Sequence, residues 1–472
     1  MDSSRHFADH AWLPQGFAAN VCIDIDRGRP GALLAVEHGA ARGGSEYLGR
    51  YIVPGMPNLH SHAFQRAMAG LAERRGQRED SFWSWREVMY AFAGRIGPED
   101  LHAIAAQLYV EMLKAGYTQV CEFHYLHHRP EGTPYADPAA MSLALVEAAR
   151  EAGIGLTLLP ALYMTGGFDG RPLSERQRRF GHGVDGYLRL LERLRALESP
   201  MLQVGVALHS LRAVPQDAMH VVLEAMSGSR FGASAMPIHI HIAEQIGEVQ
   251  DCLAVRNARP VEWLLDHAPV DPRWCLVHAT HMTEAETRRL AASGAVAGLC
   301  PTTEANLGDG LFPLKACLEA GGAIGIGSDS QISVSPVEEL RWLEYGQRLV
   351  SRHRNVSATA ATPSTGETLF AQALAGGARA SGTAVGRLAG REAGSSATGP
   401  RADLLVLDDA SPLLAGRDSA HAIDSWLFAG NSNLVRDVMV GGAWIVRGFH
   451  HRDEERIAAR YREAVERLAR AD

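Results

Sequence analysis

Short apolar runs alternate with helical patterns through the middle of the chain. The runs are rich in Val, Ile, Leu and Ala, which is typical of strands buried on both faces. Eight of them occupy residues 51–62, 118–126, 153–163, 202–210, 237–244, 274–280, 295–301 and 323–330. Patterns that predict helices occupy 99–115, 138–152, 184–197, 215–227, 246–254, 259–267, 283–292, 312–320 and 336–350.

This alternation predicts a (β/α)8 TIM-like barrel over residues 54–389. A doubly wound open sheet is the alternative for the same order of elements. An open sheet has two edge strands, which usually read as more polar. None of the eight runs is more polar than the others, so we expect a closed barrel.

The two ends of the chain follow a different pattern. Short alternating stretches at 20–26 and 32–39, and again at 402–408 and 435–448, predict strands. We expect residues 1–53 and 390–450 to form one small β-sandwich domain. Residues 451–472 combine helical periodicity with many charges, which predicts a solvated C-terminal helix.

Composition narrows the class of protein. The 472 residues carry a net charge of −8, which argues against a nucleic-acid binder. The N-terminus lacks the apolar core of a signal peptide, and no apolar run is long enough to span a membrane. The six cysteines are scattered without a C-x-x-C pair, so we expect reduced thiols in a cytoplasmic protein.

Polar side chains gather where the apolar runs end. His60 and His62 close the first run, and side chains two apart in a strand point the same way. The carboxyl ends of barrel strands carry the active site, where converging imidazoles are natural metal ligands. Two ordinary loop histidines are the alternative for this motif taken alone.

Three other strand ends add to the same set. The fifth run carries His239 and His241, the sixth carries His278, and the eighth carries Asp329. Taken alone, Asp329 also suits the N-cap of the following helix. Because strand ends meet at one barrel mouth, the combined set predicts a metal site. The role of His239, either behind a ligand or in the core, stays open.

This arrangement resembles the amidohydrolase superfamily, and the resemblance covers about residues 20–450. It implies the amidohydrolase type of barrel with His60, His62, His241 and Asp329 as metal ligands. No lysine lies in the fourth run, where members with two metals place a bridging one, so the resemblance implies one divalent ion. Zinc is the metal it implies, although this ligand set also accepts iron, nickel or manganese.

The stretch after His241 resembles the deaminase branch of that superfamily. In that branch a glutamate at the position of Glu244 carries protons to the nitrogen under attack. The resemblance implies catalytic roles for Glu244, His278 and Asp329. A glutamate at the surface start of a helix is the alternative for Glu244.

Longer strings resemble the deiminases that hydrolyse N-formimino-L-glutamate to N-formyl-L-glutamate and ammonia in histidine degradation. These strings are residues 54–73, 81–90, 121–128, 208–214 and 239–245. The resemblance implies a small-molecule substrate gripped by Arg86, Tyr125, His209 and Arg212, with Gln65 near the formimino group, and a homodimer. Arginine is suited to this task because it binds carboxylates bidentately. Surface salt bridges are the alternative for each arginine.

Two other functions remain open at this point. A deaminase of guanine, a related heterocycle or a chlorotriazine would use the same barrel, and Trp83 and Trp85 could stack on such a ring. The other is a barrel without catalysis that serves as a scaffold. Its retained metal-ligand set argues against that function.

Overall fold

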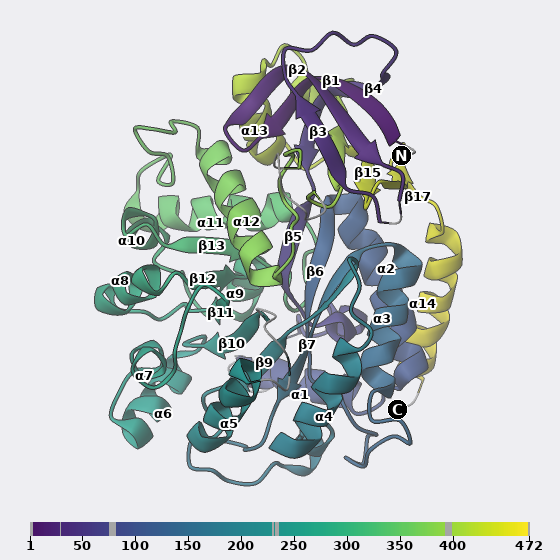
Figure 1. Cartoon of the computed structure of the whole chain (residues 1–472). Helices are drawn as coiled ribbons and strands as arrows, with labels where there is room; N and C mark the ends of the chain where they lie inside the picture. Colours follow the sequence, from purple (N-terminus) through teal and green to yellow (C-terminus); the bar gives the residue numbers. More distant parts are fainter. Residues whose placement is uncertain are drawn as a thin grey trace.

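A parallel β-barrel forms the centre of the molecule in this computed structural model (Figure 1). The structure describes residues 3–28, 30–74, 82–228, 231, 236–391 and 399–470. The barrel strands are β5 (Met56–Ser61), β6 (Tyr117–His124), β7 (Gly155–Leu162), β8 (Leu202–Val204), β9 (Val206–Ser210), β10 (Ile238–Ile242), β11 (Trp274–His278), β12 (Val296–Leu299) and β13 (Ala323–Ile326). The fourth predicted strand is interrupted at Gly205 and forms β8 and β9. All pairs between these strands are parallel, which confirms the predicted barrel class.

The barrel closes next to the candidate metal site. The Asp329 amide donates to the His60 carbonyl at 3.0 Å, and the His62 amide donates to the Asp329 carbonyl at 3.1 Å. The first and last strands approach so closely that a Cβ on Gly327 would lie 2.7 Å from the His60 Cβ. The ligands predicted on the first strand, His60 and His62, are therefore joined by backbone hydrogen bonds to Asp329, the ligand predicted on the last strand.

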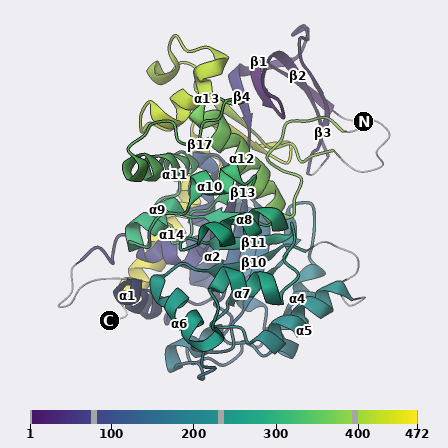
Figure 2. The same cartoon turned by 90° about the vertical axis from the view of Figure 1, so that its left-hand side faces the viewer.

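Helices surround the barrel, and Figure 2 shows them from the side of α6 to α10. Those predicted from the sequence are α2 (Pro98–Ala115), α3 (Ala140–Ala152), α4 (Val184–Arg195), α5 (Gln216–Ser227), α6 (Ile246–Arg256), α7 (Pro260–His267), α8 (Glu284–Ser293), α10 (Leu314–Glu319) and α11 (Pro336–Ser351). No described helix is both long and apolar enough to cross a membrane.

Several elements were not predicted. They are β1 (Ser3–Leu13), β17 (His450–His451), α1 (Phe82–Ala93), α9 (Pro301–Leu307), α12 (Thr365–Ser381), α13 (Ser419–Phe428) and the short 3-10 helices η1 (Ala63–Met68), η2 (Glu175–Phe180) and η3 (Pro412–Leu414). The sequence of α12 gives a poor helix signal because it contains Gly376 and Gly377, and glycine is a weak helix former. In the structure, a Cβ on Gly376 would lie 1.9 Å from the Ile324 carbonyl oxygen. Those glycines therefore allow close packing of helix on strand.

A second sheet combines the two ends of the chain. Its strands, in spatial order, are β17 (His450–His451), β16 (Ala443–Arg447), β15 (Val435–Val440), β14 (Leu404–Leu407), β4 (Glu46–Pro54), β1 (Ser3–Leu13), β2 (Gly16–Asp26) and β3 (Leu33–Glu37). They form one continuous, mostly antiparallel sheet with its own apolar core. The first apolar run is not one strand as expected, because its residues up to Pro54 belong to this sheet and barrel strand β5 starts at Met56.

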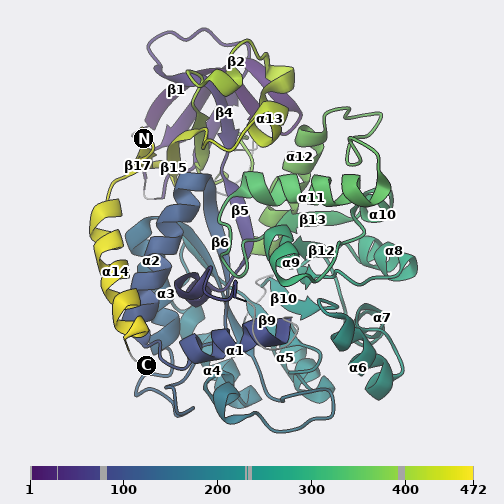
Figure 3. The same ribbon diagram turned by 180° about the vertical axis from the view of Figure 1, so that it is seen from behind.

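The C-terminal helix α14 (Glu454–Ala469) lies along α2 and α3, as Figure 3 shows from behind. Its buried residues, among them Ile457 and Leu468, pack into the main core. Ion pairs join its charged face to the barrel, with Lys114 to Glu454 at 2.6 Å and Arg460 to Glu151 at 2.5 Å. The helix is thus packed on the barrel along one face and solvated along the other.

Candidate metal and active site

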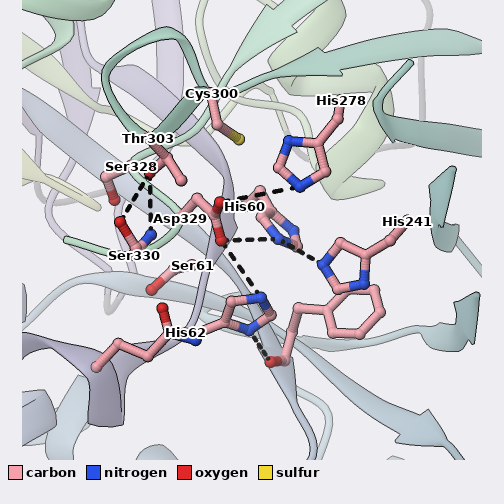
Figure 4. A network of polar contacts seen from close by, with 12 residues as sticks. His60, Ser61, His62, His241, His278, Cys300, Thr303, Ser328, Asp329 and Ser330 are labelled. Atoms are coloured by element: carbon pink, nitrogen blue, oxygen red, sulfur yellow. Dashed lines mark hydrogen bonds and ion pairs between the residues drawn. The ribbon is translucent and has the colours of Figure 1, made fainter. Parts of the chain in front are cut away.

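Four predicted ligands converge at the mouth of the barrel. Figure 4 shows His60, His62, His241 and Asp329 pointing toward one another. The Nε2 atoms of His60 and His241 are 3.0 Å apart, and Asp329 Oδ1 is 3.4 Å from His60 Nε2 and 3.3 Å from His62 Nε2. All four residues are at least nine-tenths buried. The ligand atoms of His60, His62 and His241 lie close enough together to share one ion, and so do those of His60, His278 and Asp329.

The surrounding backbone fixes which nitrogen two of the imidazoles, those of His62 and His241, present to the site. His62 Nδ1 lies 2.8 Å from the Phe123 carbonyl, and His241 Nδ1 lies 2.9 Å from the His209 carbonyl. A carbonyl only accepts, so each Nδ1 carries the hydrogen and each Nε2 presents a lone pair. Burial lowers the pKa of His60 to about 3, and burial also lowers the pKa of His241 well below its usual value. Neutral nitrogens around one carboxylate are a donor set that suits zinc.

His278 lies beside these ligands in a ring of carboxylates. Its Nε2 is 3.9 Å from both Glu244 Oε1 and Asp329 Oδ2, and its Nδ1 is 3.3 Å from Glu304 Oε1. Burial alone would lower the pKa of His278, but Glu244, Glu304 and Asp329 outweigh it and raise that pKa to about 10. Burial raises the pKa of Glu244. An imidazole that holds a proton next to a carboxyl that binds one readily is suited to acid–base chemistry.

Glu304 was missed in the sequence. It lies in α9, four residues after Cys300, and its Oε1 also accepts from the Cys300 amide at 3.0 Å. It is 4% exposed, so its carboxylate faces His278 rather than solvent. The only available signal was an acidic residue soon after a barrel strand, and such residues are common at the start of helices.

The strand ends at this site adopt an uncommon backbone conformation. Ala243, His278 and Asp329 have φ values of 50°, 68° and 44°. Residues other than glycine rarely adopt positive φ, and the surrounding structure must hold them there. The N-cap of α11 is Ser335, so Asp329 is not the helix cap that the sequence alone also allowed.

A buried carboxylate behind the ligands, Glu122 on β6, holds the segment around His62. It accepts hydrogen bonds from the Ser61 hydroxyl at 2.7 Å, the Ala63 amide at 2.6 Å and the Tyr109 hydroxyl at 3.2 Å. Two of these donors flank His62 in the chain. Glu122 was not predicted, since a glutamate within an apolar run gives no sign of what it contacts.

We expect Glu122→Gln to weaken metal binding about 10- to 100-fold, the range typical of residues that orient metal ligands. The amide that replaces one carboxylate oxygen has no lone pair for the Ser61 hydroxyl or the Ala63 amide. Competition with a chelator measures the affinity. Glu344→Gln is the matched control, because Glu344 is also buried but caps the segment of Ser357 away from the site. Equal affinities in the two variants would contradict the role of Glu122.

The five predicted substrate-binding residues lie in the same pocket as the metal ligands. Gln65, Arg86, Tyr125, His209 and Arg212 all line it, together with His62, His241, Glu244, His278 and Asp329. The Gln65 amide donates to the Tyr125 hydroxyl at 2.9 Å. Burial and then the charge of Arg212 lower the pKa of His209 well below its usual value. The sequence therefore predicted members of one cavity that come from different barrel loops.

Other residues of the pocket were not predicted. They include Met89, Tyr90, Tyr163, Phe180, Ser210, Gln245, Glu248, Asp251 and Leu307. Trp85 lines the pocket, whereas the side chain of Trp83 lies outside the described residues. His239 lies on β10, two residues before His241, and its Nε2 is 2.8 Å from the Ala380 carbonyl near the end of α12.

Comparisons with known proteins agree with this geometry. The amidohydrolase family pattern matches residues 51–445. A formimidoylglutamate deiminase from Pseudomonas aeruginosa is 54% identical over 96% of this chain and 97% of its own length. A crystal structure of an amidohydrolase from Brucella melitensis has a TM-score of 0.89 and 45% identity, and covers 99% of this chain and 100% of that one. An atrazine chlorohydrolase from Arthrobacter aurescens, complexed with zinc, shares the fold with a TM-score of 0.81 at 20% identity over 98% of this chain and 100% of that one.

The barrel with a sheet from both chain ends, the ligands at its strand ends and the match over most of the sequence agree with one another. The chain belongs to the amidohydrolase family.

Proposed function

We propose that this protein is a metal-dependent deiminase that hydrolyses N-formimino-L-glutamate to N-formyl-L-glutamate and ammonia. The observation that carries the proposal is one pocket that combines a His–Asp metal-ligand set with two arginines, Arg86 and Arg212. The substrate has a formimino group at one end and two carboxylates, so it needs both parts. The 54% identity to a formimidoylglutamate deiminase over nearly the whole chain supports the same assignment.

The ligands would be His60, His62, His241 and Asp329. One divalent ion bound there supplies a water of lowered pKa, and hence a nucleophile near neutral pH. Zinc suits the donor set, and the zinc in the atrazine chlorohydrolase of the same fold agrees with that assignment. The fourth barrel strand, which is divided into β8 and β9, contains no lysine that could bridge two ions.

The acid–base work falls to Glu244, His278 and Asp329. In the proposed reaction, Asp329 accepts the proton of the attacking water, whose oxygen bonds to the formimino carbon, and the protonated His278 orients that oxygen by a hydrogen bond. Glu244 protonates the nitrogen that leaves. The bond from carbon to that nitrogen then breaks and ammonia departs, while the hydroxyl on the carbon loses its proton to the Glu244 carboxylate. The nitrogen attached to glutamate keeps the formyl group. A buried carboxyl with a raised pKa is suited to deliver a proton at neutral pH.

The rest of the pocket would position the substrate. Arg86 and Arg212 supply bidentate donors for carboxylates, while Tyr125 and His209 add neutral donors. Gln65 Oε1 is buried and accepts no hydrogen bond from the described residues. An N–H of the formimino group would satisfy that oxygen, which supports the placement of Gln65 at the reacting end.

Three further proposals concern the cellular setting. We propose that the reaction serves histidine degradation, where the resemblance places this substrate. All six cysteines are buried and none forms a disulfide, which supports a reducing, cytoplasmic location. A homodimer, a small-molecule substrate and no nucleic-acid or membrane partner complete the proposal.

The direct test measures ammonia release by the zinc-loaded enzyme from N-formimino-L-glutamate, with N-formimino-L-aspartate and guanine beside it. We expect rapid release from the glutamate compound and much slower release from the other two, because the spacing of the two carboxylates is specific. Release from guanine alone would replace the proposal with a heterocycle deaminase. No release from any of the three, with zinc bound, would refute the substrate assignment.

A further inference from the structure

A row of apolar side chains lies along the exposed face of α11, a helix at the surface of the molecule (Figure 3). Trp342, Tyr345 and Leu349 are 40%, 37% and 74% exposed. Glu338 precedes them and Arg352 follows them on the same face, with alternating spacings of four and three residues. This spacing is typical of a helix that packs against a second helix. The exposure of these side chains shows that the described part of the chain leaves the row largely uncovered.

Apolar residues on neighbouring segments widen this row. The Phe428 ring of α13 lies 5.9 Å from the Tyr345 ring, centroid to centroid, and the Arg348 guanidinium lies 5.4 Å from the centroid of each. Leu311 is 46% exposed and packs on α11 so closely that a Cβ on Gly346 would lie 2.6 Å from its Cδ2. The α11 patch is made up of Leu311, Trp342, Tyr345, Leu349, Val350 and Phe428. Monomeric soluble proteins seldom expose a continuous apolar patch, so this one calls for a partner.

Charges of opposite sign stand at the two ends of the patch. Glu338 lies in the first turn of α11, whereas Arg352 is its C-cap and Arg354 follows in the chain. Both arginines are exposed, and no ion pair among the described residues involves them or Glu338. In an antiparallel pair of α11 helices, Glu338 of each chain would lie opposite the basic end of the other, and the apolar centres would face each other. The patch is thus complementary to itself, as a contact across a two-fold axis requires.

Other surfaces and other occupants fit less well. Ile246 and Leu253 on α6 are 53% and 42% exposed, but the same helix carries Glu248 and Asp251, which line the active-site pocket. Among the described residues that line this pocket, none belongs to the α11 patch, so a partner on the patch does not compete with the substrate. Helices that lie on membranes are rich in Lys and Arg along the polar face, whereas the charges around the α11 patch have both signs.

We propose that a second copy of this chain covers the α11 patch, with the two α11 helices antiparallel across a two-fold axis. This inference rests on the homodimer that is part of the proposed function, not on the proposed reaction, and it adds the surface that pairs. A stable dimer buries about 800 Å² on each partner. A helix of 16 residues is about 24 Å long, so its single face supplies only part of that area. Leu311 and Phe428 therefore belong to the interface as well.

Leu349→Glu tests this surface, and Leu253→Glu on α6 is the matched control. Both variants replace an exposed helical leucine with glutamate, so both should keep the circular dichroism spectrum of the wild type. We expect light scattering to give twice the mass of one chain for the wild type and Leu253→Glu, and the mass of one chain for Leu349→Glu. The dissociation constant of the dimer should rise more than about 100-fold, because the substitution buries two carboxylates without partners. A monomeric wild type, a dimeric Leu349→Glu or a monomeric Leu253→Glu would each overturn the proposal.

A charge exchange tests the antiparallel arrangement without changing Leu349. Arg352→Glu should raise the dissociation constant of the dimer about 3-fold or more, because like charges replace opposite ones at both ends of the helix pair. Adding Glu338→Arg restores opposite charges, so the double variant should dimerise more tightly than Arg352→Glu alone. Effects that simply add in the double variant would show that the helices do not pair in this way. These measurements need neither metal nor substrate, so failure of the dimer and failure of the proposed reaction are distinguishable.

Discussion

Glu244→Gln is expected to lower kcat for the deimination by about 10²- to 10⁴-fold, the usual contribution of a positioned acid or base. Glutamine has nearly the same shape, but it cannot carry a proton to the leaving nitrogen. Glu244 follows Ala243, whose φ of 50° turns the chain at the end of β10, and its Oε1 lies 3.9 Å from His278 Nε2. Steady-state kinetics with N-formimino-L-glutamate measure the loss.

The same variant should keep its metal and its substrate affinity. Glu244 is not among the residues whose ligand atoms converge on the candidate ion. Metal analysis should therefore give the wild-type content, and KM should change far less than kcat. A variant that retains more than about a tenth of the wild-type kcat would exclude Glu244 as the acid, since no general acid of consequence would have been removed.

The barrel was predictable because its strands are buried on both faces and so read as continuous apolar runs. The site was predictable in part for the same reason, since His60, His241 and His278 interrupt such runs where polar residues are unexpected. The prediction that the first apolar run forms a single strand was wrong. Apolar residues on both sides of Gly55 look alike, although they belong to two different sheets.

Residues whose role depends on a distant partner were not predictable. The role of Glu122 depends on Ser61 at the end of β5 and on Ala63 at the start of η1, and the role of Glu304 depends on His278. Tyr163 lies at the end of an apolar run, and its position in the sequence gives no sign that the Gln177 amide donates to its hydroxyl. Sequence patterns show which side chains are buried at a strand end, while the contacts between loops decide what those side chains do.

His241→Asn and His239→Asn form a matched pair that tests the metal site. The two histidines lie on β10 with one residue between them, and both are buried. His241 Nε2 lies 3.0 Å from His60 Nε2, at the point where the ligands converge, while His239 Nε2 is 2.8 Å from the Ala380 carbonyl. The same chemical change therefore removes a candidate ligand in one variant and a structural hydrogen bond in the other.

We expect His241→Asn to lose most of its bound metal, with activity falling further than the 10- to 100-fold expected for an orienting residue such as Glu122. Two neutral imidazole nitrogens at 3.0 Å repel each other unless a proton or a cation lies between them. The hydrogen of His241 lies on Nδ1, which faces the His209 carbonyl, so His241 Nε2 presents the lone pair that would bind the ion and that asparagine lacks at this position. His239→Asn should keep one ion per chain and lose stability only. Equal metal content in both variants would show that the four residues do not form the metal site.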